Sequence, residues 1–168
     1  APLRCRPDRS AVTLPRLAAP DRARAGDIAS RFSSARVLVV GDVMLDQFLI
    51  GRVSRISPEA PVPIVQFERE ENRIGGAANV AHNIAALGGH ATLIAVTGRD
   101  DTAATLTEAC RESGIRPSLV GDPSRPTTTK VRVVTDRNQQ VTRIDYESDT
   151  EISGEIEQRI VAEIQRHA

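Results

Sequence analysis

The chain has 168 residues, 40% of them hydrophobic, and its 22 basic and 22 acidic residues leave no net charge. This length and composition suit one folded domain or part of a larger one, and argue against a wholly disordered chain. The lack of a basic excess argues against a nucleic-acid or membrane-surface binder, and the 2% aromatic content argues against a base-stacking surface. No apolar run approaches the ~18 residues of a membrane span.

Residues 1–26 carry six arginines and two acidic residues, and four prolines interrupt any helix. They lack the apolar stretch of a secretory signal, so we expect a disordered leader or a mis-assigned start, followed by one domain over 27–168. The two cysteines, Cys5 and Cys110, lack the spacing of a metal site or a redox motif. Free thiols in a reducing compartment, and hence a cytoplasmic protein, are the expectation.

The middle of the chain alternates segments typical of strands and helices. In chain order we expect a helix at 27–32, a strand at 36–40 buried on both faces, a strand at 47–51 stopped by Gly51, an extended segment at 62–68 after a proline-rich turn, a helix at 75–87, a strand at 91–96, a helix at 101–113 and a strand at 115–120. Asp100 and Asp101 suit the N-cap of the second long helix. This order predicts βαβ units with right-handed crossovers around a parallel sheet.

The pattern changes near residue 127. Residues 127–135 and 140–146 alternate polar and apolar side chains, which predicts a β-hairpin. Residues 151–167 predict an amphipathic helix. Because about three parallel strands are few for an α/β domain, and no strand follows the last helix, we expect a chain that covers the first half of such a domain, with the C-terminal half absent.

Two glycine-containing segments are candidate binding elements. Asp42 and Asp46 follow the first strand, at the sheet edge where open α/β sheets bind ligands, and their carboxylates could accept hydrogen bonds from sugar hydroxyls. An ordinary strand-ending turn is the alternative. Gly75 and Gly76 permit close backbone approach at a helix start that also carries Asn79, although glycine there also has a purely structural explanation.

The predicted hairpin carries the third candidate site. Alternation places Lys130, the only lysine, on one face with Arg132 and the opposing Arg143. Three cations there suit a phosphate, since arginine offers two parallel donors; a solvated hairpin face is the alternative. The three histidines show neither metal-ligand spacing nor a catalytic arrangement, and we predict no metal site in the chain.

Five blocks of sequence together indicate a family. They are VVGDVMLD at 39–46, SRISPEAPVPI at 54–64, GGAANVAHNIAALG at 75–88, TTTKVRV at 127–133 and NQQVTRIDYE at 138–147. In these blocks the chain resembles the ribokinase-like (PfkB) sugar kinases. It is most similar to the branch that phosphorylates D-glycero-D-manno-heptose 7-phosphate at C1 with ATP, often as the N-terminal part of a bifunctional kinase/adenylyltransferase of lipopolysaccharide precursor synthesis.

The resemblance implies an α/β fold with a central, mostly parallel sheet flanked by helices, and a small β lid formed by strands near 47–51 and 62–68 and the hairpin 127–147. It also implies ATP and Mg²⁺ as cofactors of the intact enzyme, and a homodimer formed through the lid. By position in the motifs, the implied sugar-phosphate ligands are Asp46, Gly75, Gly76, Asn79, Lys130, Arg132 and Arg143.

One family motif is missing from the sequence. The G-A-G-D segment, with its aspartate base, does not occur, so the chain contains no catalytic residue and we expect it to be inactive alone. Two alternatives stay open: a PfkB kinase for another sugar, and a non-catalytic sugar-phosphate-binding or dimerisation module. A nicotinamide-dinucleotide domain is disfavoured because G-x-G-x-x-G is absent.

Overall fold

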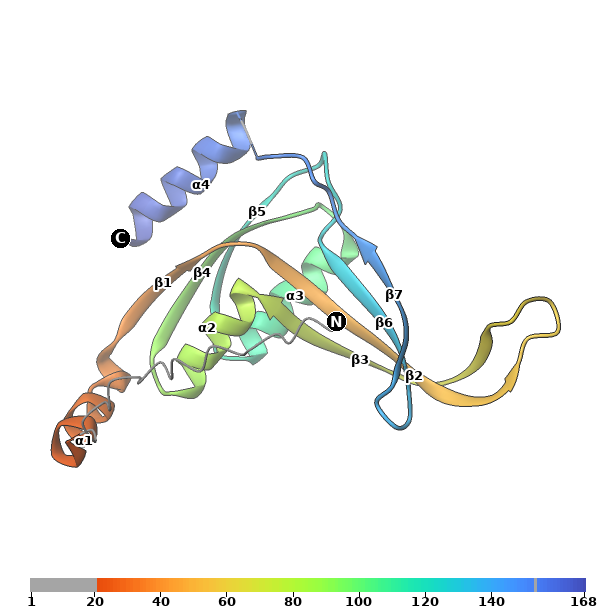
Figure 1. Cartoon of the computed structure of the whole chain (residues 1–168). Coiled ribbons are helices and arrows are strands. Elements are labelled where there is room, and N and C mark those ends of the chain that lie inside the picture. Colours follow the sequence, from red (N-terminus) through yellow and green to blue (C-terminus); the bar gives the residue numbers. More distant parts are fainter. Residues whose placement is uncertain (1–20, 153) are drawn as a thin grey trace, which may run out of the picture. The chain divides into compact units, whose positions relative to one another are not determined.

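The computed structural model describes residues 21–152 and 154–168, and the chain divides into two units, residues 1–30 and 31–168 (Figure 1). The first unit contributes helix α1 (Arg22–Ser30). This helix begins five residues before the predicted start at Asp27, because the Asp21 carboxylate accepts a hydrogen bond of 3.0 Å from the Ala23 N–H. Residues 22–26 are therefore helical, where a disordered leader was predicted; the prediction for 1–20 lies outside the described residues.

The second unit builds two sheets. Its strands are β1 (Arg36–Val40), β2 (Val43–Ile56), β3 (Pro63–Gly76), β4 (His90–Thr97), β5 (Arg116–Gly121), β6 (Thr129–Thr135) and β7 (Gln140–Tyr146). Its helices are a 3₁₀ turn (Phe32–Ser34), α2 (Ala77–Ala86), α3 (Asp101–Glu112) and α4 (Gly154–His167). One sheet is parallel, with the order β1-β4-β5, and the other is mixed, with the order β3-β2-β6-β7.

The parallel sheet confirms the predicted βαβ units. Helices α2 and α3 pack on one of its faces, and Asp100 caps α3 as predicted, its carboxylate accepting from the Ala103 N–H. The core between them is aliphatic, as the near absence of aromatic residues requires. Its buried members are Val43, Leu45, Ala78, Ala81, Ala91, Leu93, Ala95, Leu106, Cys110 and Ile115. Burying each large side chain contributes about 1.5–3 kcal/mol.

Helix α4 covers the opposite face of the parallel sheet, where Ser118 of β5 donates a hydrogen bond to Glu163 (Figure 1). Its main contacts in this sheet are with β4 and β5. The prediction that the strand at 36–40 is buried on both faces is therefore wrong: β1 lies at the sheet edge, and Val40 is 48% exposed. In the described part of the chain, every helix is too short or too polar to cross a membrane.

The mixed sheet contains longer strands than predicted. Gly51 does not stop a strand but lies at a register shift inside β2, where a Cβ would come within 2.3 Å of the Gln66 carbonyl oxygen. Only glycine allows β3 to approach this closely, so β2 continues to Ile56. The predicted hairpin is confirmed as β6 and β7, and β6 joins β2 in parallel.

Candidate functional site

One face of the mixed sheet collects four of the predicted site residues. In β2, Asp46 pairs in register with Lys130 of β6, two residues before Arg132, which in turn pairs with Arg143 of β7. Directly paired residues, and residues two apart on one strand, share a face. The structure thus confirms that the three cations share a face and adds Asp46 to it. We call these four residues and their ion partners the lid face.

The central contact of the lid face is an ion pair between Arg132 Nη1 and Asp46 Oδ1. Both side chains are 21% exposed, so the pair is partly shielded from water. The Arg132 guanidinium also lies 5.4 Å from the centre of the Phe48 ring, with Arg73 at 4.6 Å from the same ring. These contacts hold the Asp46 carboxylate in place.

The other two cations also have acidic partners. Lys130 Nζ lies 3.2 Å from Asp145 and 3.1 Å from Glu147, and these hydrogen bonds raise the pKa of Lys130. Arg143 Nε lies 2.8 Å from the other oxygen of Asp145. Burial by itself would raise the pKa of Asp145, but the hydrogen bonds from Lys130 and Arg143 outweigh it and lower that pKa. The three predicted phosphate ligands are thus matched by three carboxylates, those of Asp46, Asp145 and Glu147.

The predicted glycine pair lies next to Asp46, although not as the first turn of a helix. Gly75 and Gly76 end β3, and α2 begins at Ala77. A Cβ on Gly75 would lie 2.7 Å from Asp46 Oδ2, so a larger residue would displace the carboxylate. Gly76 adopts φ +60°, and the Ala77 N–H donates a 2.8 Å hydrogen bond to the Asp42 carbonyl. The positive φ interrupts the helix, which explains why its start was predicted two residues early.

Asn79 is the predicted site residue with the least structural support. It is the third residue of α2 and its side chain is exposed. Lys130 lines a pocket of about 370 Å³ with Asp42, whereas Arg132 lines another of about 520 Å³ with Phe48. Asn79 lines neither of these two pockets, so its role stays a prediction.

Sequence reasoning missed part of the lid face. Phe48, Arg73 and Glu147 were not singled out, although the Phe48 ring lies against the guanidinium groups of Arg132 and Arg73. Glu147 forms an ion pair with Lys130. The alternation of β2 could have identified Phe48, because it lies two residues beyond Asp46 and therefore on the same face of the strand. The pairing of β2 with β6 had no such signal, because these two strands are distant in sequence.

The fold and the lid face together define a ribokinase-like α/β protein. Residues 34–163 match the pfkB family of carbohydrate kinases, and the chain belongs to this family. A solved carbohydrate kinase from Agrobacterium tumefaciens superimposes with a TM-score of 0.56 at 22% identity, over 66% of this chain and 35% of that one, a likeness of fold.

Two curated relatives are much closer in sequence. A D-beta-D-heptose 7-phosphate kinase of Bordetella bronchiseptica is 54% identical over 123 residues, which are 73% of this chain and 39% of the relative. The bifunctional protein HldE of Shewanella putrefaciens is 53% identical over 116 residues, which are 69% of this chain and 24% of the relative. The chain thus spans less than half the length of either relative.

Proposed function

We propose that this chain is the N-terminal, sugar-binding part of a kinase that phosphorylates the C1 hydroxyl of D-glycero-D-manno-heptose 7-phosphate, a step toward ADP-heptose for lipopolysaccharide. The 54% identity to a heptose 7-phosphate kinase carries this proposal and favours heptose over another sugar. Because the phosphoryl donor would be ATP, we assign the protein to the cytoplasm.

The carboxylate of Asp46 is our candidate for binding the sugar hydroxyls. One of its oxygens is paired with Arg132, and the other lies beside Gly75, which has no side chain to displace it. Gly75 and Gly76 would let the sugar approach the backbone, and Asn79 would add a side-chain amide at the start of α2. An acceptor that is already oriented loses little entropy when the sugar binds.

The three cations of the lid face would bind the 7-phosphate. Each already has a carboxylate partner, so the phosphate must replace or share at least one of these contacts. Arg143 is the most accessible of the three, with 47% of its side chain exposed, against 18% for Lys130 and 21% for Arg132. We therefore assign the first contact with the phosphate to Arg143, and its orientation to Lys130 and Arg132.

ATP and Mg²⁺ are assigned to the intact protein. Residues 21–152 and 154–168 contain no group of three or more His, Cys, Asp or Glu side chains that could hold a metal ion, and the G-A-G-D aspartate is absent from the sequence. We therefore expect the 168-residue chain to bind the sugar phosphate without phosphorylating it.

The lid supports the proposal of a homodimer. Beyond Gly51, β2 pairs with β3 alone, and together they form a hairpin that extends past the rest of the mixed sheet (Figure 1). Apolar side chains near its tip are exposed, with Ile56 at 61%, Val62 at 51% and Phe67 at 62%. A second copy of the hairpin would bury them. Light scattering should give twice the monomer mass, and Phe67→Ser should shift the mass toward that of the monomer.

Calorimetric titration of the chain with heptose 7-phosphate, heptose and fructose 6-phosphate tests the sugar assignment. Binding of heptose 7-phosphate should weaken at least about tenfold in Arg143→Gln, since a charge-assisted contact is lost. Heptose should bind more weakly than its phosphate and be insensitive to this variant. Arg137→Gln, an exposed arginine in the turn of the same hairpin, is the matched control. Equal binding of all three sugars, or none, would contradict the proposal.

A further inference from the structure

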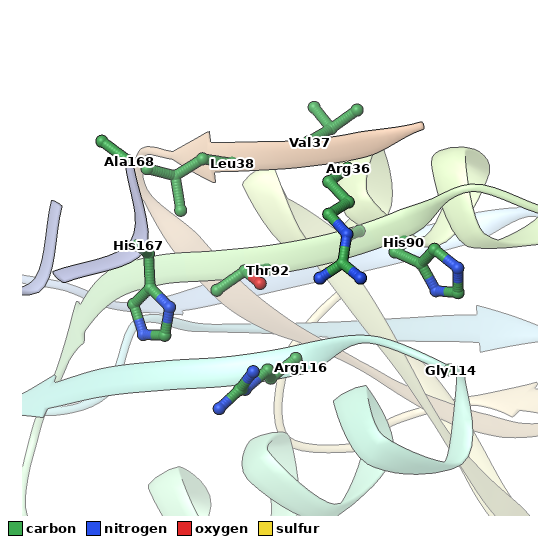
Figure 2. A pocket seen from close by; sticks show the side chains of 10 residues that line it. Arg36, Val37, Leu38, His90, Thr92, Gly114, Arg116, His167 and Ala168 are labelled. Atoms are coloured by element: carbon green, nitrogen blue, oxygen red, sulfur yellow. The ribbon is translucent and has the colours of Figure 1, made fainter. Parts of the chain in front are cut away.

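A third pocket lies at the opposite end of the parallel sheet from Asp42 and the glycine pair. It encloses about 560 Å³. Three of its lining residues, Arg36, His90 and Arg116, are the first residues of β1, β4 and β5 (Figure 2). Ligand sites of open α/β sheets lie at the other, carboxyl edge, so nothing in the proposed kinase reaction uses this pocket.

The strand register explains why basic side chains converge there. Arg36 pairs with His90, and Thr92, two residues further along β4, pairs with Arg116. Paired residues share a face, so all four side chains lie on the face that carries α4. With strands about 4.8 Å apart, Arg36 and Arg116 have Cα atoms roughly 12 Å apart, on either side of Thr92. The last turn of α4 adds His167, and Figure 2 shows these side chains around the Thr92 hydroxyl.

The charged side chains that line the pocket are all basic. No Asp or Glu side chain lines it, and neither Arg36 nor Arg116 has an acidic partner among residues 21–152 and 154–168. The nearest acid on α4 is Glu163, 3.7 Å from His167, and it is already engaged by Ser118 and Arg166. An anion between Arg36 and Arg116 would be attracted to both guanidinium groups.

We propose that this pocket binds the phosphate groups of a phosphorylated small molecule. Arg36 and Arg116 would each grip phosphate oxygens through two N–H groups, while the Thr92 hydroxyl and His167 would contact the same oxygens. Leu38, which pairs with Thr92 and so lies on the same face, also lines the pocket and would contact the organic part of the ligand. The volume is within the range of small-molecule sites and exceeds what one phosphate needs, so a diphosphate should bind more tightly than a monophosphate.

Titration of the 168-residue chain with inorganic pyrophosphate and with inorganic phosphate tests this site. Pyrophosphate should bind more tightly, and Arg116→Gln and Arg36→Gln should each weaken it at least about tenfold. His167→Gln, which changes a residue of α4 rather than of a strand, should also weaken pyrophosphate binding. The matched control is Arg55→Gln, an exposed arginine near the end of β2, which should leave binding within about twofold of the parent chain. Thermal unfolding of each variant verifies that it is folded.

Three results would overturn the proposal. They are the absence of pyrophosphate binding, unchanged binding in both Arg36→Gln and Arg116→Gln, and an equal loss in Arg55→Gln, which would indicate nonspecific attraction to surface arginines. The site is independent of the kinase assignment. Arg143→Gln should weaken the binding of heptose 7-phosphate while leaving pyrophosphate binding unchanged, so failure of one proposal does not imply failure of the other.

Discussion

Replacing Gly76 by alanine tests whether the junction between β3 and α2 is as rigid as the structure indicates. Gly76 has φ +60° and ψ −133°, a conformation that residues with a side chain rarely adopt. A Cβ placed there would lie 2.4 Å from the carbonyl oxygen of Asp42, the same oxygen that accepts a hydrogen bond from the Ala77 N–H at 2.8 Å. The neighbour is backbone and cannot rotate away.

The expected loss of stability has two parts. The backbone conformation costs about 1–3 kcal/mol for a residue other than glycine. Displacing the Asp42 carbonyl weakens the hydrogen bond to Ala77, at about 1 kcal/mol. Together they predict that Gly76→Ala lowers the free energy of unfolding by roughly 2–4 kcal/mol, which for a chain of this size lowers the melting temperature by roughly 4–16 °C.

Gly88→Ala is the matched control. Gly88 also has a positive φ, +89°, but a Cβ there meets no atom within 4 Å, so only the conformational part applies, about 1–2 kcal/mol. Urea denaturation followed by circular dichroism gives both free energies. If Gly76→Ala costs no more than Gly88→Ala, the Asp42 contact is not rigid, and the reasoning about this junction is refuted.

Two further predictions concern titrating groups. Burial by itself would raise the pKa of Asp100, but hydrogen bonds from the Thr127 hydroxyl and from the Thr127 and Ala103 amides outweigh it and lower that pKa. The ionised carboxylate therefore stabilises the fold above the ordinary carboxyl pKa of about 3.9, and this contribution is lost as the pH falls through the lower folded value. The stability difference between the parent chain and Asp100→Asn should shrink from pH 7 to pH 3 in urea denaturation; a constant difference would contradict this reasoning. Burial raises the pKa of the Cys110 thiol to about 11. In a Cys5→Ser background, Ellman's reagent at pH 8 should label Cys110 only after unfolding, and rapid labelling of the folded chain would show that the α3 core opens.

Local sequence signals predicted most of the elements correctly. The strands at 36–40, 91–96 and 115–120 and the helix at 101–113 all occur close to their predicted bounds, because each combines a hydrophobic period with a clear start or stop. The N-cap role of Asp100 was predictable for the same reason: the capped amide of Ala103 is three residues away.

The errors occurred where distant segments meet. Gly51 has the local character of a strand end, but β3 approaches it so closely that the strand continues with a register shift. Gly75 and Gly76 have the local character of a helix start, but the positive φ of Gly76 next to Asp42 delays the helix to Ala77. Val40 belongs to a run typical of a buried strand, yet β1 lies at the edge of the parallel sheet and Val40 is 48% exposed.

In the candidate site, too, some features follow from the local sequence pattern and others from the pairing of distant strands. The alternation of β6 places Lys130 and Arg132 on one face, because neighbouring side chains in a strand point in opposite directions whatever the strand pairs with. Arg143 joins them through the register of the hairpin, which shifts between Val133 and Val134. Whether Arg132 is free or paired depends on β2, which brings Asp46 to it from 86 residues earlier in the chain. The motifs of the sequence thus determined the family and the types of side chain. Only the tertiary structure decided their partners, since ion pairs between distant strands follow from register, and no local pattern records it.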